Sequence, residues 1–181
     1  MNPCDYLSDV RALAKQAGER ILEIYNTEFS VKEKDDRSPL TAADMASHKA
    51  IVAGLQALTP DIPVLSEEAA KIPFEERSGW HTYWLIDPLD GTKEFIKRNG
   101  EFTVNIALVQ DGVPVLGVVH VPVSGVTYAA CQGAGAVKEV PGQGEQPIRV
   151  RKLPDGPVAV VGSRSHRGDS LNSFLEKLGE H

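Results

Sequence analysis

The sequence predicts an α+β protein in which helices pack on one face of a largely antiparallel sheet. Three observations support this. Two stretches near the start of the chain have helical periodicity, and most of residues 82–130 alternate or run apolar as strands do. The pair Asp111-Gly112, which favours a tight hairpin, joins two of the strand-like stretches. Helices followed along the chain by a run of strands are typical of a layered α+β domain.

Two helices are predicted first. Apolar residues of the first recur at three- and four-residue steps, at Leu7, Val10, Ala14, Ala17, Ile21 and Ile24. Thr41 is expected to start the second, because Asp44 follows at the capping-box spacing, with Asp replacing the usual Glu or Gln. Its core face comprises His48, Ile51, Val52, Leu55 and Leu58, and Pro60 ends it. The charged segment 32–39 is expected to be an exposed loop or a hairpin tip.

The strands follow. A short strand at residues 62–65 precedes Ser66-Glu67-Glu68, which is expected to cap a helical turn. A second short strand at residues 82–86 is expected to point into a loop that begins at Asp87. The remaining prediction is strands at residues 102–108, 113–123, 126–130 and 158–161, a Gly-rich connection at 141–146 and a short helix at 170–178.

Composition excludes several classes of function. The formal net charge of -6 argues against broad electrostatic binding to nucleic acid polymers. The chain has no apolar run near the roughly 18 residues of a spanning helix, and no signal-peptide pattern. Cys4 and Cys131 lack metal-ligand spacing, which argues against a thiolate zinc site, and two unclustered cysteines fit a reducing compartment. We therefore expect a cytoplasmic protein, with peripheral membrane association left open.

The segment after residue 86, Asp-Pro-Leu-Asp-Gly-Thr, has the residue types of a cation site. Pro88 has no N–H and is expected to stop the strand ladder. Asp87 and Asp90 can then aim two carboxylates at one point, with the Leu89 carbonyl between them. Hard cations such as Mg²⁺ prefer oxygen ligands of this kind. Two carboxylates about 4 Å apart repel by roughly 4 kcal/mol at an effective dielectric of 20, and a cation relieves that repulsion.

The same segment predicts a phosphate contact. Gly91 permits a sharp turn, and Thr92 begins what reads as a helical turn with free N–H groups. Metal-assisted phosphoryl chemistry needs cation ligands and phosphate donors side by side. A plain turn is the alternative, because Asp, Pro and Gly are the residues that turns prefer.

The wider sequence makes a resemblance specific. Residues 84–95, WLIDPLDGTKEF, are similar to the signature of the lithium-sensitive inositol monophosphatase superfamily, and the continuation KEF resembles its 3'(2'),5'-bisphosphate nucleotidase branch. Three further segments fall in the family's order: SPLTAAD at 38–44, VLSEE at 64–68 and SRSH at 163–166. The resemblance implies the first domain of the inositol monophosphatase and fructose bisphosphatase fold, a sandwich of helices and antiparallel sheet.

The resemblance implies a role for each matching residue. The metal ligands would be Glu67, Asp87, the Leu89 carbonyl and Asp90. Three residues would be catalytic: Thr92, Asp44 and Glu67. The hydroxyl of Thr92 would help to activate the attacking water, and Asp44 would orient that threonine. The substrate contacts would be Glu67, Leu89, Asp90, Gly91, Thr92 and His166, with the last reaching the nucleotide.

Each role has a plainer alternative. Asp44 would otherwise be an N-terminal acid that interacts with the helix dipole, although it shares a face with the apolar side of its helix. Glu68 could replace Glu67 as the ligand, and His166 could be a surface histidine. The remaining candidates are expected to be solvated or structural: Asp35, Asp36, His48, His81, His120, His181, Trp80 and Trp84.

The implied activity is Mg²⁺-dependent removal of the 3'-phosphate of adenosine 3',5'-bisphosphate, giving AMP and phosphate by attack of a metal-activated water. Two or more Mg²⁺ ions, inhibition by Li⁺ and a small phosphorylated nucleotide as substrate would follow. The alternatives are an inositol or sugar-phosphate monophosphatase of the same superfamily, and a non-catalytic metal- or nucleotide-binding protein.

One departure from the family pattern affects the domain prediction. Family members are longer, and their second domain carries a Trp-Asp-x-Ala-Ala-Gly-like motif that this sequence lacks. We therefore expect residues 1–155 to form the metal- and phosphate-binding domain and residues 156–181 to begin a truncated second domain. In a truncated second domain, the terminal helix and the sheet edge after Val161 would expose apolar surface, and this surface would favour a homo-oligomer.

Overall fold

The computed structural model describes residues 2–27, 39–69, 72–153, 155–162 and 169–178. The chain divides into two compact units, residues 1–148 and 149–181. Whether residues 156–181 begin a longer second domain stays a prediction.

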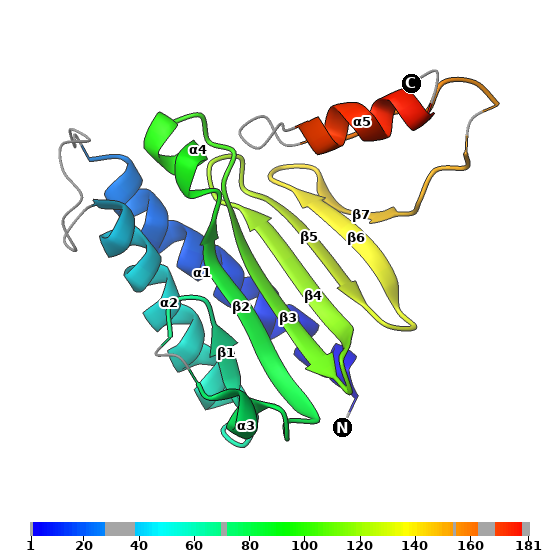
Figure 1. Cartoon of the computed structure of the whole chain (residues 1–181). Coiled ribbons are helices and arrows are strands. Elements are labelled where there is room, and N and C mark those ends of the chain that lie inside the picture. The colour runs from blue at the N-terminus through cyan, green and yellow to red at the C-terminus, as the bar shows by residue number, and fades with distance from the viewer. Residues whose placement is uncertain (1, 28–38, 70–71, 154, 163–168, 179–181) are drawn as a thin grey trace. The chain divides into compact units, whose positions relative to one another are not determined.

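A seven-stranded sheet organises the described part of the first unit, and its strands lie in sequence order (Figure 1). β1 and β2 pair in parallel, and each later neighbour pairs antiparallel. The strands are β1 Val64–Ser66, β2 Thr82–Asp90, β3 Thr103–Gln110, β4 Val113–Val121, β5 Val126–Cys131, β6 Gly135–Val140 and β7 Gly144–Ile148. The predicted, largely antiparallel sheet is confirmed.

Two long helices cover one face of this sheet (Figure 1). A 3-10 turn, η1 Pro3–Tyr6, leads into α1 Leu7–Tyr25, which contacts β3, β4 and β5. Helix α2 Pro39–Leu58 contacts β1 and β2 and lies against α1. Two short helices, α3 Phe74–Arg77 and α4 Thr92–Lys97, flank β2 in the chain. The predicted arrangement of helices on one face is therefore confirmed.

The core lies between the long helices and the sheet. Inward residues of both layers are almost fully buried, among them Ile21, Ile51, Leu55, Trp84, Phe102, Ile106 and Leu116. Trp84 also donates its indole N–H to Thr59 Oγ1 at 2.8 Å, so this tryptophan packs in the core as expected. On the opposite face, Leu85, Val119 and Tyr128 remain 37–43% exposed, because successive strand residues point to opposite sides.

The hairpin between β3 and β4 forms as predicted. Asp111 and Gly112 both have positive φ, 48° and 77°. Such turns match the twist of the flanking strands.

Several predicted boundaries are wrong. Helix α2 already includes Pro39, so Thr41 lies inside the helix and does not cap it. Residues 67–68 form a turn and no helix follows directly, although Ser66 Oγ accepts the N–H of Glu68 at 3.3 Å, as a capping side chain would. The part of the predicted 32–39 loop before Pro39 lies outside the described residues.

Three predictions for the sheet also differ from the structure or need new bounds, and the last predicted helix forms. Strand β2 continues through Pro88 to Asp90, because a register shift between Asp87 and Asp90 removes the need for an N–H at the proline. Residues 141–146 belong largely to the β6–β7 hairpin, where Val140 pairs with Gly144. In the second unit, residues 158–161 form no strand, whereas the predicted last helix is confirmed as α5 Asp169–Leu178.

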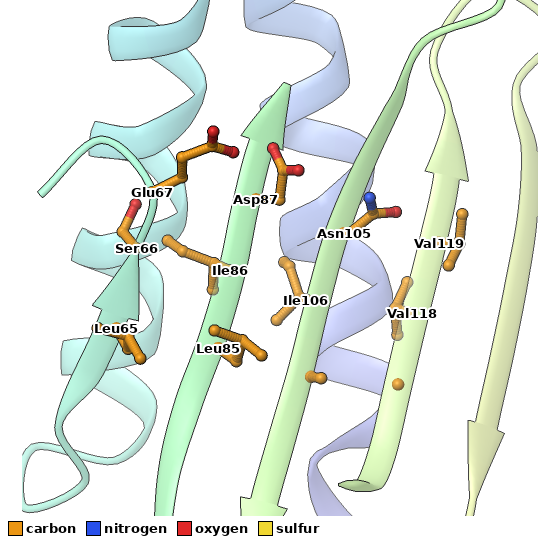
Figure 2. Close-up of a pocket in the computed structure, with 12 residues that line it drawn as sticks. Leu65, Ser66, Glu67, Leu85, Ile86, Asp87, Asn105, Ile106, Val118 and Val119 are labelled. Atoms are coloured by element: carbon orange, nitrogen blue, oxygen red, sulfur yellow. The ribbon is translucent and has the colours of Figure 1, made fainter. Parts of the chain in front are cut away.

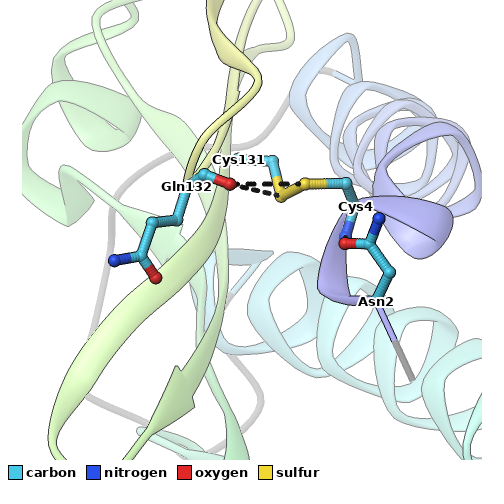
Figure 3. Close-up of a disulfide and its surroundings, with 4 residues drawn as sticks. All are labelled: Asn2, Cys4, Cys131 and Gln132. Carbon is cyan, nitrogen blue, oxygen red and sulfur yellow. Dashed lines mark hydrogen bonds between the residues drawn. A yellow bond between two sulfur atoms is a disulfide. The ribbon is translucent and has the colours of Figure 1, made fainter.

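The two cysteines form a disulfide between η1 and the end of β5 (Figure 3). A separation of 127 residues hid this pairing from sequence reasoning. The cysteines therefore give no support to the predicted reducing compartment, since disulfides persist mainly in oxidising ones. Among the described residues, no helix has both the length and the apolar character needed to span a bilayer.

Candidate metal and phosphate site

The parallel pairing of β1 and β2 brings two acidic segments together. Parallel strands have their carboxyl ends at the same edge, and Ser66 pairs with Ile86. The next residues along each strand are therefore neighbours, and the N–H of Glu67 donates to the Ile86 carbonyl at 3.3 Å. Glu67, Asp87 and Asn105 line one end of a cavity of about 510 Å³, whose other walls are mostly apolar (Figure 2).

The chain after Asp87 is held by helix α2 and by its own turn. The hydroxyl of Ser47, fully buried on α2, donates to the Pro88 carbonyl at 2.7 Å. Leu89 is 2% exposed, so its side chain anchors the segment in the core. Gly91 has a φ of 98° and is the N-cap of α4, with its carbonyl accepting the N–H of Phe95 at 2.9 Å. The predicted helical turn at Thr92 is therefore confirmed.

Asp44 lies on α2 facing both acidic segments, and it is only 8% exposed. Burial raises the pKa of Asp44 to about 8, with further contributions from the charge of Glu68, from a side-chain hydrogen bond with it, and from the charges of Asp87 and Glu67. One carboxylate oxygen, Oδ1, is buried and has no hydrogen-bond partner among the described residues. A buried acceptor without a partner is costly, so this oxygen is suited to accept a hydrogen bond from a further donor.

Asp87 is perturbed in the same direction. Burial raises its pKa to about 6, the charges of Glu67 and Asp90 add to the shift, and a backbone hydrogen bond from Leu89 opposes it. In the part of the chain that the structure describes, no three His, Cys, Asp or Glu side chains converge as the ligands of a bound metal do. The candidate ligands are nevertheless all oxygens, and the negative charges of Glu67, Asp87 and Asp90 repel one another. These residues therefore fit a hard divalent cation, which would compensate the negative charge.

The structure separates the two candidate ligands after β1. Glu67 lines the cavity with Asp87, whereas Glu68 lies beside Asp44. This arrangement favours Glu67 as the residue that faces a ligand. Thr92 is exposed at the first turn of α4, and its orientation by Asp44 stays a prediction. His166 lies outside the described residues, as do Asp35 and Asp36.

Sequence reasoning missed Asn105, Ser47 and the partner of His48. Asn105 Nδ2 donates to Asp90 Oδ2 at 3.3 Å, and His48 Nδ1 forms a hydrogen bond of 2.8 Å with Ser66 Oγ, next to Glu67. A signal for Asn105 existed, because the alternation in β3 places this amide on the face opposite the core. No sequence pattern indicates the strand that it lies beside.

Comparison with family models and curated proteins gives one consistent relationship. A model described as "Inositol monophosphatase family" matches residues 5–180. The "3'(2'),5'-bisphosphate nucleotidase CysQ" of Salmonella typhimurium is 54% identical over 177 residues, which cover 97% of this chain and 70% of that protein. The protein of the same name from Haemophilus influenzae is 37% identical over 171 residues, 94% of this chain and 64% of that protein.

Solved structures agree with these matches. CysQ from Bacteroides thetaiotaomicron, described as a bacterial member of the inositol monophosphatase family, superposes with a TM-score of 0.82 at 44% identity, covering 96% of this chain and 69% of that chain. The inositol monophosphatase of Anabaena superposes with a TM-score of 0.63 at 27% identity, covering 76% of this chain and 48% of that chain.

Proposed function

The chain belongs to the inositol monophosphatase family, and from this premise we propose that it is a 3'(2'),5'-bisphosphate nucleotidase. The reaction is removal of the 3'-phosphate of adenosine 3',5'-bisphosphate, which gives AMP and phosphate. The supporting observation is 54% identity, over 97% of this chain, to the nucleotidase of Salmonella typhimurium. A small phosphorylated nucleotide is accordingly the substrate, and sulfur metabolism is the expected setting.

The residues that would hold Mg²⁺ are Glu67, Asp87, Asp90 and the carbonyl of Leu89. The pKa of Asp87, raised to about 6 by burial and by its acidic neighbours, supports this set, because a cation relieves the same repulsion. When bound, Mg²⁺ neutralises phosphate oxygens and makes a water more acidic. Two or more ions, and inhibition by Li⁺, are part of the proposal.

The chain's own groups orient the reactants. The N–H groups of Gly91 and Thr92 hold the phosphate, and the Thr92 hydroxyl orients the attacking water. Asp44 orients Thr92, and His166 contacts the nucleotide. The left-handed backbone of Gly91 supports the first of these roles, since it starts the helix at which the phosphate would sit.

Two further expectations stand as proposals. The first is a cytoplasmic location, which now rests on the composition alone, because the Cys4–Cys131 disulfide removes the cysteines as an argument for a reducing compartment. The second is a homo-oligomer, which would cover exposed apolar side chains of the last segment and the terminal helix, such as Val161 and Phe174.

An inositol monophosphatase is the second candidate, supported by the match to the Anabaena structure with its TM-score of 0.63. Phosphate release with Mg²⁺ from adenosine 3',5'-bisphosphate and from inositol 1-phosphate separates the two. We expect faster release from the nucleotide. Faster release from inositol 1-phosphate would contradict the nucleotidase assignment, and Mg²⁺ binding without release from either substrate would favour a non-catalytic binding protein.

A further inference from the structure

His48 of helix α2 contacts the strand end that carries Glu67, and the proposed reaction gives this histidine no role. Its Nδ1 forms a hydrogen bond of 2.8 Å with the hydroxyl of Ser66, the last residue of β1. Ser66 is buried, and its hydroxyl also accepts the N–H of Glu68 at 3.3 Å. A hydroxyl has one donor and two acceptor positions, so it satisfies both contacts with either tautomer of the imidazole.

The backbone hydrogen bonds of the turn that follows β1 are longer than this contact. The N–H of Ala69 donates to the Ser66 carbonyl at 3.3 Å, and the N–H of Glu67 donates to the Ile86 carbonyl at the same distance. Such bonds usually measure about 2.9–3.0 Å, so both are weak. The side-chain contact from His48, at 2.8 Å, is therefore a strong anchor for a turn that its own backbone holds loosely.

Helix α2 holds this turn on both sides of Glu67. Asp44 and His48 are four residues apart, so they lie on the same face of the helix. Asp44 forms a side-chain hydrogen bond with Glu68, and His48 forms one with Ser66. Glu67 lies between these two anchored residues, and its side chain lines the cavity of the candidate site (Figure 2).

His48 itself lies outside that cavity wall. It lines a separate cavity of about 250 Å³, and Ser66 is the residue that lines both cavities. The Ser66 hydroxyl is thus the direct connection from His48 to the turn.

We propose that His48 is a positioning residue that acts through the Ser66 hydroxyl to hold Glu67 in the orientation that a divalent cation requires. The imidazole fixes the hydroxyl, the hydroxyl fixes the turn by accepting the Glu68 N–H, and the turn aims Glu67 into the cavity. A carboxylate that is oriented before the cation binds loses less conformational freedom on binding. This inference rests on the proposed function, because it takes Glu67 as a cation ligand.

The test is titration of the full chain with Mg²⁺, followed by calorimetry, for a set of variants at position 48. The amide atoms of asparagine lie two bonds from Cβ, as Nδ1 of histidine does, whereas those of glutamine lie one bond further out. His48→Leu and His48→Gln should weaken Mg²⁺ binding about tenfold, the lower end of the range for outer partners of a metal site. His48→Asn should restore most of the affinity, because it returns a polar atom to the place of Nδ1.

The same variants separate positioning from helix stability. Glutamine is a better helix former than histidine, and asparagine is close to histidine. A loss of binding caused by a weakened α2 would therefore be repaired by His48→Gln rather than by His48→Asn. Urea unfolding of each metal-free variant measures stability directly. The matched control is His81→Leu, because the exposed His81 also forms a 2.8 Å hydrogen bond through Nδ1, to Asp111 Oδ1, before the start of β2. This control should leave the Mg²⁺ affinity unchanged.

A double-substitution cycle tests the path through Ser66. Ser66→Ala alone should weaken Mg²⁺ binding as His48→Leu does, and the two together should cause little further loss, because residues that share one hydrogen bond are not additive. Additive losses, an unchanged affinity in His48→Leu, or rescue by His48→Gln in place of His48→Asn would overturn the inference and leave the proposed function in place. Absence of Mg²⁺ binding by the wild-type chain would overturn both.

Discussion

Replacement of Gly91 by alanine tests whether the turn after β2 depends on a residue without a side chain. The backbone of Gly91 is left-handed, with a φ of 98°, and an L-residue there costs about 1–2 kcal/mol. A Cβ would also lie 3.0 Å from the Glu101 carbonyl oxygen and 3.2 Å from Phe102 Cα. Both atoms belong to the backbone and cannot rotate away, so overpacking adds roughly 1–3 kcal/mol. We expect Gly91→Ala to lower the free energy of unfolding by roughly 2–5 kcal/mol.

Gly112→Ala is the matched control. Gly112 also has a positive φ, 77°, yet a Cβ there meets no atom within 4 Å. Only the backbone cost of about 1–2 kcal/mol applies. Urea unfolding followed by tryptophan fluorescence gives both values, and phosphate release gives the activity, which Gly91→Ala should lose and Gly112→Ala should keep. Equal destabilisation by the two substitutions would refute the argument from close packing.

Four other outcomes are expected. Asp90→Asn should abolish Mg²⁺-dependent phosphate release with the fold intact by circular dichroism, whereas the exposed control Asp111→Asn should retain it; full activity in the first variant would contradict the ligand assignment. Reduction of the disulfide, or Cys131→Ala, should lower the free energy of unfolding by up to about 5 kcal/mol, the chain-entropy value for a loop this long, and an unchanged urea midpoint would count against the pairing. The pKa of Asp87 is raised to about 6, so protons should compete with Mg²⁺ for this carboxylate. The Mg²⁺ affinity of the chain, measured by titration calorimetry, should therefore fall as the pH drops through about 6. Burial lowers the pKa of His120 in the folded chain below 6.5, so on acidification the unfolded chain takes up this proton at a higher pH than the folded chain does. The stability present above about pH 6.5 should therefore be lost as the pH falls through the folded pKa. Thermal melts of His120→Gln should lack this pH-dependent loss of stability.

The elements with strong local signals were predictable from the sequence. The helical periodicity of α1 and the alternation in β3 each depend on a face that must be buried, and both elements form where expected. The hairpin at Asp111 depends on two adjacent residues that tolerate positive φ. Predictions failed where a wider context decides, as at Pro88, because the register shift that accommodates a proline inside β2 depends on the pairing with β3.

The candidate site was only partly predictable. The carboxylates at 87 and 90 lie in one short segment with Gly91, so sequence spacing indicated either a cation ligand set or a plain turn, and the family resemblance favoured the ligand set. For Asn105 the alternation in β3 indicated only the face of the sheet, and its contact with Asp90 carried no sequence signal, because the two residues are on different strands. The sequence could not separate Glu67 from Glu68 as the candidate metal ligand. In the structure, Glu67 lines the cavity and Glu68 lies beside Asp44.

By itself, the sequence determined the layered α+β class and indicated the residue types of a candidate cation and phosphate site. Periodicity and turn preference are properties of neighbouring residues, so they can be read without coordinates. Only the tertiary structure decided that β1 lies parallel to β2, which brings Glu67 beside Asp87, and that Cys4 meets Cys131. Strand pairing and disulfide partners join distant segments, and they follow from the packing free energy of the whole sheet and its covering helices rather than from any local pattern.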